Sequence, residues 1–487
     1  TYERAFKLDP EDPELLINLG LTAWNLGIAE GAARMFELYI AACPDSPLGY
    51  NNLGSVQCDL GMPEVGIETL RAAIYRMPGE SILWNSFATL LAEQGRADES
   101  LVFYQEAIRL EPGFARAYHN LGYAYQHLGD LKAALEGYDE ALLRVTDVSE
   151  RRETEHSRSI CLIGMGRLDE GFREYEIRNH ERFRSYLHHL IKAPHWKGED
   201  IAGKKVLLVG EQGLGDEFMF ANILPDVQRA VGPQGKLQIA VDPRLVGLFQ
   251  RSFPQAEVGT YDDRTLLDND GNKALRLIPF VAGGNEPDFW APMGSALQYY
   301  RKRIEDFPHQ AFLTPDPERV ENFRQALAKL GPGKKIGICW RSMMLGAKRA
   351  KYYSAIDAWA PILKTPDVQF VSLQYGDSAA DIARVKEMFG IDIHVMAGLD
   401  LRDDIDGAAA LSRALDLVIS APTAAAATAA SVGAKVWFLT AGRTWPQLNT
   451  DEYPWYADTK VHSPEKFGDW AQVMPVIAEK LVAFAAG

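Results

Sequence analysis

Apolar positions in the first third of the chain fall in helical clusters, and the residues between these clusters repeat every 34 positions. The repeated proline is found at Pro10, Pro44, Pro78 and Pro112. The repeated glycine is found at Gly27, Gly61, Gly95 and Gly129. Glycine breaks the chain between two helices, and proline cannot continue the second helix into the next unit. The pattern therefore predicts a tandem array of helix pairs.

Consecutive units align without gaps, and they begin at Tyr50, Trp84 and Tyr118. This arrangement resembles the tetratricopeptide repeat (TPR). After a three-residue insertion, a further unit keeps Gly166, Gly171 and Tyr175 in register. We therefore expect residues 1–183 to form a right-handed TPR superhelix with a concave face. The opening TYERAFKLDP matches the second helix of a repeat, which indicates a longer natural array.

Asparagines recur near the start of the first helix of successive units. They are Asn18, Asn51, Asn52, Asn85 and Asn120. One interpretation is an amide ladder that holds the backbone of an extended polypeptide, because each repeat adds one row of side chains to the groove. The alternative is ordinary helix-surface polarity or capping within the repeats. In either case the array predicts a protein partner.

From about residue 204 onward, short continuous apolar runs alternate with longer helical stretches. The first set is KKVLLVG, KLQIAV and LRLIPF, and the second is KKIGICW, VQFVSL, IDIHVM, LDLVIS and AKVWFL. This alternation indicates parallel sheets covered on both faces. The polar, proline-rich stretch 311–320 separates the two sets, so we expect Rossmann-like domains at 184–318 and 319–487. Ligands of such sheets bind beyond the carboxyl ends of the strands.

The first strand-end loop, GEQGLGDEFMFANILP, combines flexible glycines with a carboxylate. Gly213 and Gly215 allow a tight turn and a close approach to a ligand, and Asp216 follows them. A carboxylate in this place suits a general base for a hydroxyl acceptor. The alternative is that Asp216 caps a helix beginning at Glu217. The loop has neither the GxGxxG spacing nor the lysine of a P-loop.

The second strand-end loop, CWRSMMLGAKRAKYYSAIDAWAP, concentrates cations in an acidic chain. Arg341 and Ser342 leave the strand directly, and Lys348, Arg349 and Lys351 follow. This cluster predicts a diphosphate site, with solvated surface charge as the alternative.

Two further strand-end loops add polar residues. Asp377, in SLQYGDSAADIARV, suits a hydrogen bond to ribose hydroxyls or a helix N-cap. In LVISAPTAAAATAASVG, Ser420, Pro422 and Thr423 precede an alanine-rich helix. Proline is preorganised for a first helical turn, and the unpaired N–H groups there attract phosphate. The small alanines fit either a closely approaching ligand or tight helix–sheet packing.

The ordered set of motifs resembles bacterial repeat-containing glycosyltransferases of the heptosyltransferase-like group. The motifs are PHWKGEDIAGKKVLLVGEQGLGDEFMFA, WRS, YYSAIDAWAPIL, FVSLQYGD, DGAAALSRALDLVISAPTA and YPWY. The resemblance covers the whole chain, and within this group it points to proteins linked to flagellin glycosylation. It implies a GT-B fold of two facing Rossmann-like domains, with the acceptor on the first and the nucleotide sugar on the second. It also implies metal-independent, inverting transfer.

The resemblance assigns a role to each candidate residue. It makes Asp216 the catalytic base, and it places the nucleotide sugar against Arg341, Ser342, Lys348 or Lys351, Gln374, Tyr375, Asp377, Ser420 and Thr423. The groove asparagines Asn18, Asn52, Asn85 and Asn120 would hold the protein acceptor. No metal or cofactor is implied beyond the nucleotide-sugar donor.

One motif departs from the family pattern. Heptosyltransferases read Asp-Thr-Gly and then His at the fourth loop, where this chain has Pro422, Thr423, Ala424 and Ala427. The missing aspartate and histidine argue against an ADP-heptose donor. They indicate either another nucleotide sugar or a domain that binds without turnover.

Composition restricts the function further. The formal net charge of −15 argues against nonspecific nucleic-acid binding. No apolar run is long enough to span a membrane, and the four cysteines show no metal-ligand spacing, as expected in a reducing cytoplasm. The sequence thus predicts a cytoplasmic protein O-glycosyltransferase acting on Ser or Thr, with flagellin and a CMP-linked nonulosonic acid as the suggested substrates. The alternatives are a non-catalytic TPR scaffold and, less favoured, a transferase for lipid-linked glycan.

Overall fold

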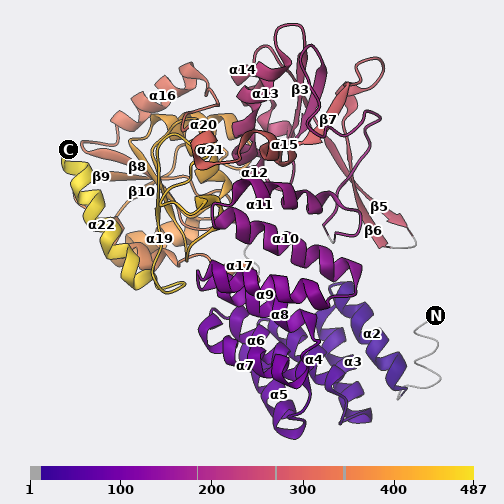
Figure 1. Cartoon of the computed structure of the whole chain (residues 1–487). Helices are drawn as coiled ribbons and strands as arrows, with labels where there is room; N and C mark the ends of the chain where they lie inside the picture. Colours follow the sequence, from indigo (N-terminus) through magenta and orange to yellow (C-terminus); the bar gives the residue numbers. More distant parts are fainter. Residues whose placement is uncertain (1–11, 184, 269–270, 344–346) are drawn as a thin grey trace. The chain divides into compact units, whose positions relative to one another are not determined.

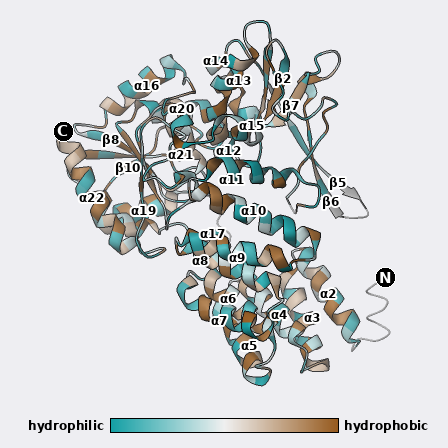
Figure 2. Ribbon diagram, viewed as in Figure 1, coloured by the Kyte–Doolittle hydropathy of each residue, from teal (hydrophilic) through white to brown (hydrophobic). Residues whose placement is uncertain are grey.

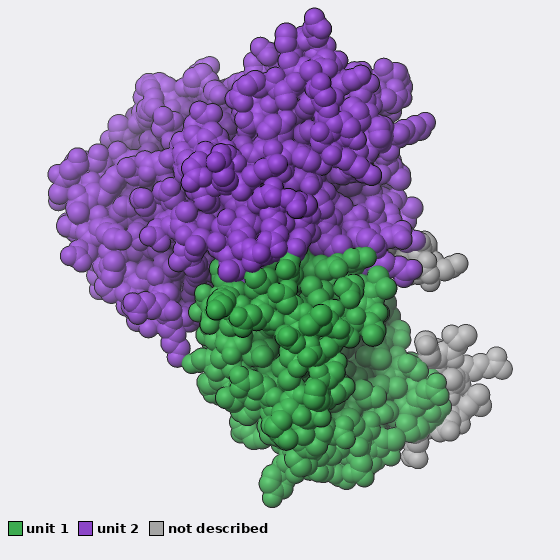
Figure 3. All heavy atoms as spheres, viewed as in Figure 1, with its two compact units in different colours: residues 1–158, 345–351 green, residues 159–344, 352–487 purple. Residues whose placement is uncertain are grey.

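The computed structural model of the chain describes residues 12–183, 185–268, 271–343 and 347–487 (Figure 1). The contacts divide the chain into two compact units, which Figure 3 shows in different colours. Unit 1 comprises the described residues of 1–158 and 345–351, and unit 2 comprises those of 159–344 and 352–487.

Unit 1 is built from successive helix pairs, and Figure 2 shows hydrophobic and hydrophilic positions interleaved along its helices. They are α2 (Pro13–Asn25), α3 (Ala29–Ala42), α4 (Pro47–Asp59), α5 (Pro63–Arg76), α6 (Ser81–Glu93), α7 (Ala97–Leu110), α8 (Ala115–His127) and α9 (Leu131–Arg144). The glycines at 34-residue intervals have φ values between 77° and 82°. Side-chain-bearing residues rarely adopt this conformation, which explains the repeated glycine. The prediction of TPR-like helix pairs is confirmed.

The two helices of a repeat cross so closely that glycine is required at the contact. A Cβ added to Gly66 on α5 would lie 2.5 Å from the carbonyl oxygen of Gly54 on α4. A Cβ added to Gly137 on α9 would lie 2.8 Å from the Cα of Gly122 on α8. These approaches let side chains such as Leu70 pack fully buried between the helices.

Unit 2 contains a parallel sheet of four strands in the order β4-β3-β2-β7. The strands are β2 (Lys205–Val209), β3 (Lys236–Val241), β4 (Glu257–Thr260) and β7 (Phe289–Pro292). The chain moves outward from β2 to β4 and then returns to pair β7 with the other edge of β2. The carboxyl ends of β2 and β7 therefore flank a topological switch point.

A second parallel sheet of unit 2 has the order β10-β9-β8-β11-β12-β13. Its strands are β8 (Lys334–Cys339), β9 (Val368–Ser372), β10 (Ile393–His394), β11 (Leu417–Ser420), β12 (Val436–Leu439) and β13 (Thr459–His462). This is the order of a doubly wound sheet, and its switch point lies between β8 and β11. The predicted α/β region with parallel sheets is confirmed.

Helices precede, connect and follow the strands of both parallel sheets. They include α11 (Leu168–Glu174), α12 (Leu214–Phe220), α13 (Leu224–Val231), α14 (Val246–Ser252), α15 (Met293–Tyr300), α16 (Pro317–Ala328), α18 (Ala360–Leu363), α19 (Ala379–Phe389), α20 (Ile405–Ala414) and α21 (Ala424–Ser431). The longest of them is α22 (Trp470–Ala486), and α10 (Val148–Gly164) spans the boundary between the two units. Within the described ranges, no helix combines the length and the hydrophobicity needed to cross a bilayer.

One predicted parallel strand was wrong. The run LRLIPF at 275–280 contributes to β6 (Gly271–Leu277), which pairs antiparallel with β5 (Asp262–Asp268) and parallel with β1 (His188–His189). The reason is Arg276, which interrupts the apolar run and makes it alternate, as half-buried antiparallel strands do. Three strands of the parallel sheets, β4, β7 and β13, were missed because their sequences, EVGT, FWAP and TKVH, do not form continuous apolar runs.

A continuous apolar core joins the two parallel sheets of unit 2. It includes the fully buried Trp455, whose ring lies 5.0 Å from that of Phe307 and 5.9 Å from that of Trp445, centroid to centroid. The backbone carbonyl of Trp455 also accepts a 2.7 Å hydrogen bond from Asn222. The YPWY motif is therefore a packing element that ties the second sheet to helices of the first.

The glycine crossing in the repeats gives a test of the packing. Gly66→Ala should lower the free energy of unfolding by about 1–3 kcal/mol, because the new methyl group meets the backbone of Gly54 and cannot be relieved by a rotamer change. Gly113→Ala is the control, since a Cβ at Gly113 meets nothing within 4 Å. Urea unfolding followed by circular dichroism measures both, and equal stabilities of the two variants would contradict the close crossing.

Candidate functional site

The carboxyl ends of both parallel sheets of unit 2 border one cavity of about 320 Å³. It is lined by Leu214, Arg244, Ser342, Met343, Leu373, Tyr375, Leu401, Arg402, Ile405, Ala408, Ser412, Ala424, Ala425 and Thr428. The loops after β8 and β9 supply Ser342 and Tyr375, and α21, which follows β11, supplies Ala424. The cavity thus lies at the switch point of the second sheet, where doubly wound sheets bind their ligands.

Two of the predicted donor-site residues line this cavity. Ser342 and Tyr375 face it together, and their hydroxyl oxygens lie 3.5 Å apart. The mainly apolar remainder of the lining comes from leucine, isoleucine, methionine and alanine side chains. A mostly apolar pocket with a few polar groups is typical of small-molecule sites, which usually measure about 300–1,000 Å³.

Two predicted residues, Gln374 and Ser420, are buried at the strand ends. Gln374 accepts hydrogen bonds from the backbone N–H groups of Trp340 (3.1 Å) and Arg341 (3.0 Å), and its amide donates to the Arg341 carbonyl (2.8 Å). The Ser420 hydroxyl donates to the Ala421 carbonyl at 2.7 Å. These contacts hold the loops after β8, β9 and β11 in fixed positions.

Thr423 is the N-cap residue of α21, and its hydroxyl lies 3.6 Å from the sulfur of Cys339 at the end of β8. Burial raises the pKa of the Cys339 thiol to about 11, so this sulfur stays protonated. The Thr423 hydroxyl makes no capping bond to the first turn of α21. The backbone N–H groups of that first turn therefore receive no hydrogen bond acceptor from the N-cap side chain.

Arg341 and Asp377 turn toward α19. Arg341 donates to Asp381 at 3.0 Å and 3.2 Å and to the backbone carbonyl of Asp377 at 3.0 Å. The Asp377 carboxylate accepts a 3.2 Å bond from the N–H of Ala379. Neither residue is among those that line the cavity.

Of the two predicted lysines, only the side chain of Lys351 is described by the structure. Lys351 belongs to unit 1, where its ammonium group donates to the Ala92 carbonyl at 3.3 Å. Lys348 lies in the short helix α17 (Ala347–Ala350), and its side chain is outside the described residues.

The first strand-end loop begins a helix earlier than predicted. Helix α12 starts at Leu214 rather than Glu217, with Gly213 as its N-cap. Asp216 is therefore not the N-cap residue; it lies half-buried in the first turn, and its carboxylate accepts a 3.3 Å hydrogen bond from the Gly213 N–H. A Cβ added to Gly215 would lie 3.9 Å from the backbone N of Ala424, which brings the starts of α12 and α21 together.

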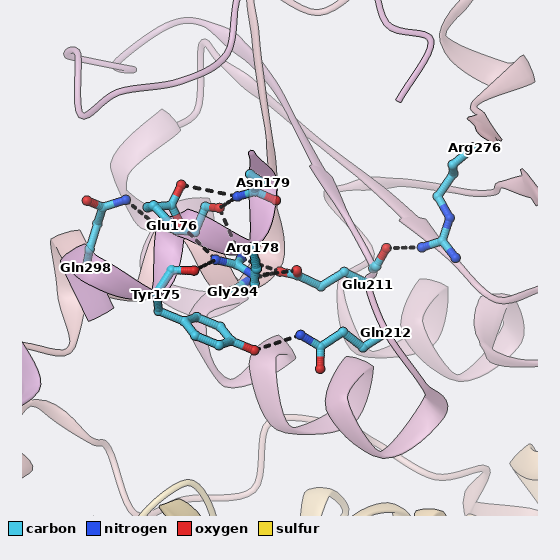
Figure 4. A network of polar contacts seen from close by, with 11 residues as sticks. Tyr175, Glu176, Arg178, Asn179, Glu211, Gln212, Arg276, Gly294 and Gln298 are labelled. Atoms are coloured by element: carbon cyan, nitrogen blue, oxygen red, sulfur yellow. Dashed lines mark hydrogen bonds and ion pairs between the residues drawn. The ribbon is translucent and has the colours of Figure 1, made fainter. Parts of the chain in front are cut away.

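A buried ion pair holds the beginning of the same loop in place (Figure 4). Arg178, in η1 (Tyr175–Asn179), donates to both oxygens of Glu211, at 2.8 Å and 2.7 Å. Burial alone would lower the pKa of Arg178, but the Glu211 carboxylate outweighs burial and raises this pKa. Glu211 also accepts a 2.7 Å bond from the N–H of Gly294, at the start of α15. The pair therefore fills the switch point of the first sheet, between β2 and β7.

Gln212, the next residue, is also held in place. Its φ of 63° is unusual for a residue with a side chain, and its amide donates to the Tyr175 hydroxyl at 2.7 Å. The Arg178 guanidinium lies 4.2 Å from the centroid of the Tyr175 ring. Segment η1 therefore determines the path of the chain immediately before Asp216.

Glu217 is a buried acid beside the candidate base. It accepts a hydrogen bond from the Tyr261 hydroxyl and a 3.2 Å bond from the N–H of Asp242. Burial raises the pKa of Glu217 to about 7, although both hydrogen bonds oppose this shift. The Arg276 guanidinium lies 3.4 Å over the Tyr261 ring and pairs with Asp263. This network fixes α12 to the end of β3.

Sequence reasoning missed four charged residues of these sites. Arg244 and Arg402 line the cavity, and Arg178 and Glu211 form the buried pair. Glu211 had a usable signal, since it follows a buried strand directly. The arginines had none, because they lie outside the loops that follow the predicted strands or close to aspartates that suggest ordinary surface charge.

In unit 1, the groove asparagines bond to one another. The Asn120 amide donates to Asn85 Oδ1 at 3.0 Å, and the Ser86 hydroxyl donates to Asn51 Oδ1. The Asn51 amide donates to Asn52 Oδ1 at 3.1 Å. The backbone carbonyl of Asn18 accepts from Thr22. The first two of these bonds connect neighbouring repeats across intervals of 35 residues.

A small cavity of about 90 Å³ lies at the end of this row. It is lined by Ala115, Arg116, His119, Asn120, Val145, Glu150, Glu153 and Thr154. Burial lowers the pKa of His119 to about 4, so its ring is neutral at physiological pH. The predicted acceptor residue Asn120 thus borders an indentation between α8 and α10.

Comparison with known families identifies the repeats. A model described as TPR repeat matches residues 89–129, and one described as Tetratricopeptide repeat matches residues 115–144. The crystal structure of MamA is 26% identical, covering 29% of this chain and 84% of that chain, with a TM-score of 0.25. A thermophilic TPR protein of Thermus thermophilus is 22% identical, covering 34% and 88%, with a TM-score of 0.30.

A comparison with known proteins extends the relationship to both units. Protein FlbA of Caulobacter vibrioides is 39% identical over 486 residues, which cover 100% of this chain and 81% of that protein. The chain belongs to the FlbA family. Membership in the FlbA family includes the α/β region of unit 2, which neither TPR model reaches.

The buried ion pair gives a stability test. Arg178→Met should lower the free energy of unfolding by about 3–5 kcal/mol, because Glu211 is left as an unpaired buried charge. The double variant Arg178→Met with Glu211→Leu should recover part of this loss, since it removes that charge. Denaturant unfolding of the wild type, both single variants and the double variant measures these effects. The assignment would be contradicted if the double variant lost more free energy of unfolding than the two single variants lose together.

Glu217 gives a test in pH. Its folded pKa of about 7 lies above the ordinary value of 4.5, so the folded protein binds the extra proton between these values. This contribution to stability is present below pH 4.5 and is lost as the pH rises through 7. Glu217→Gln mimics the protonated acid, so its stability relative to wild type should rise by about 2–3 kcal/mol between about pH 5 and 8. Parallel pH profiles in urea unfolding would show that the carboxyl group is not perturbed.

Proposed function

We propose that the chain is a protein O-glycosyltransferase with a GT-B arrangement, in which unit 2 binds a nucleotide sugar and the repeats of unit 1 recruit the polypeptide acceptor. The sugar passes to a Ser or Thr hydroxyl of that acceptor. Flagellin and a CMP-linked nonulosonic acid are the proposed substrates, from the family that the motifs resemble.

The observation that carries the proposal is the 320 Å³ cavity. It lies at the switch point of a doubly wound sheet and is also lined by Leu214 and Arg244, which follow strands of the first sheet. Two sheets that present their carboxyl ends to one cavity can bring a donor and an acceptor together.

Asp216 is the proposed base because of its position near this cavity. It is two residues after Leu214, which lines the cavity, and the start of its helix meets the start of α21. In the reaction the acceptor hydroxyl oxygen forms a bond to the anomeric carbon, and the bond from that carbon to the phosphate oxygen breaks. The hydroxyl proton passes to Asp216, and the negative charge departs on the phosphate. The Gly213 N–H bond keeps the Asp216 carboxylate oriented.

Polypeptide recruitment is supported by the TPR array. Such arrays bind extended segments along their concave faces. The asparagine row and the cavity beside Asn120 supply hydrogen-bonding groups on the first helices of successive repeats. The amides use part of their hydrogen-bonding capacity on one another, so a bound peptide would have to pair with the remaining donors and acceptors.

A non-catalytic TPR scaffold is the second candidate, and the contacts of the cations favour it. Arg341 is paired with Asp381 and does not line the cavity. The positions where heptosyltransferases carry the aspartate and the histidine are Pro422 and Ala427.

A transfer assay separates the two candidates. The protein is incubated with flagellin and a panel of nucleotide sugars, and the mass added to the acceptor is measured. Asp216→Asn should reduce transfer by about 10²–10⁴-fold, because the amide keeps the cap bond but cannot take a proton. Asp469→Asn, which changes the cap of α22, is the matched control and should keep wild-type transfer. The absence of added mass with every donor would support the scaffold.

A further inference from the structure

The charged side chains that line the cavity of unit 2 are all cationic. Among its described lining residues, Arg244 and Arg402 carry charge, and aspartate and glutamate are absent. The rest of the lining is apolar apart from Tyr375 and the hydroxyl groups of Ser342, Ser412 and Thr428. A pocket of this kind favours a ligand with an apolar body and an anionic group.

The charge of Arg244 is already compensated. Its guanidinium donates to both oxygens of Asp242, each at 2.9 Å, and it lies 3.9 Å from Asp403. These hydrogen bonds raise the pKa of Arg244 and hold its side chain in one position. Its remaining contact is a 3.1 Å hydrogen bond to the backbone carbonyl of Arg402. Arg244 therefore positions the loop that carries Arg402.

Arg402 differs in that its backbone is fixed while its guanidinium is exposed. Its N–H donates to Asp400 at 2.8 Å, and its carbonyl accepts the bond from Arg244. The exposed side chain makes no hydrogen bond or ion pair with any residue that the structure describes. Arg402 is thus an uncompensated cation held at the cavity wall.

The aspartates that follow Arg402 in sequence do not form an ion pair with it. Asp403 is mostly exposed and lies 3.9 Å from Arg244. Asp404 pairs with Arg319, and Asp406 pairs with Arg251 at 2.8 Å and 2.7 Å. Neither carboxylate lines the cavity. None of these three carboxylates therefore pairs with the Arg402 guanidinium.

We infer that Arg402 binds the anionic group of the ligand in this cavity. The inference rests on the proposed function for the identity of that ligand, a nucleotide sugar. Arg341, which the sequence pattern assigned to the phosphates, donates instead to Asp381, so the cavity needs another cation. The anion is either the phosphate of the nucleotide or the carboxylate of an acidic sugar, since a guanidinium forms paired hydrogen bonds with both.

Isothermal titration calorimetry tests this assignment with defined probes. The probes are CMP, UDP, GDP, ADP, inorganic pyrophosphate and a free nine-carbon acidic sugar. Arg402→Gln should lower the affinity for the probe that wild type binds best by about 10–100-fold, because a charge-assisted hydrogen bond is lost. Arg402→Lys should retain part of the affinity. Arg413→Gln is the matched control, because Arg413 is exposed on the neighbouring helix α20 and does not line the cavity.

The probes also identify the anion. A loss confined to nucleotides and pyrophosphate would assign Arg402 to phosphate, and a loss confined to the acidic sugar would assign it to a carboxylate. Equal affinities of wild type and Arg402→Gln, or no binding of any probe to wild type, would overturn the inference.

The outcome can be separated from that of the transfer assay. If binding depends on Arg402 but no transfer occurs, the anion site is supported and the proposed catalytic activity is contradicted. If Arg402→Gln transfers sugar with an unchanged KM for the donor, the catalytic activity is supported and the role of Arg402 is contradicted.

Discussion

The buried pair between Arg178 and Glu211 is the interaction on which the arrangement of unit 2 depends. Removing two charges from water costs several kcal/mol for each ion, and a bidentate pair repays this only when the remaining hydrogen-bonding groups are also satisfied. Here Gly294 donates to the carboxylate, while Ser295 and the Tyr175 carbonyl accept from the guanidinium. Because η1 follows the last helices of the array, this pair fixes the beginning of the α/β region to the strand end that carries the GEQG loop.

The pair also accounts for a difference between the two sheets. Each has a switch point at its central strand, and each would ordinarily offer a ligand crevice there. In the first sheet, the Glu211 carboxylate occupies the start of α15 and Arg178 neutralises it. In the second sheet, the corresponding place beside α21 borders the cavity, where Ala424 and Ala425 have small side chains. The first sheet therefore contributes a rigid wall, and the second contributes the ligand space.

The sequence could predict those features that depend on local periodicity. The glycines at 34-residue intervals determine the helix pairs, and the apolar runs identified β2, β3 and the strands from β8 to β12. Strands of four residues with mixed burial, such as β4, leave too weak a pattern. Ser342 and Tyr375, both in predicted strand-end loops, line the cavity. Which partner a long side chain selects, as Arg341 selects Asp381, depends on the packing of α19 and was not encoded near Arg341 in the chain.

The partners of the cationic side chains also depend on the folded structure. In a chain with a formal net charge of −15, most guanidinium groups meet a carboxylate nearby, and the structure shows this for Arg244, Arg251 and Arg319. Cation count in a loop is therefore a poor guide to a ligand site, as the fate of Arg341 shows. A cation is informative when its own neighbours leave its charge uncompensated and its backbone is fixed beside an apolar cavity. Arg402 meets both conditions because Asp400 and Arg244 bind its main chain rather than its side chain.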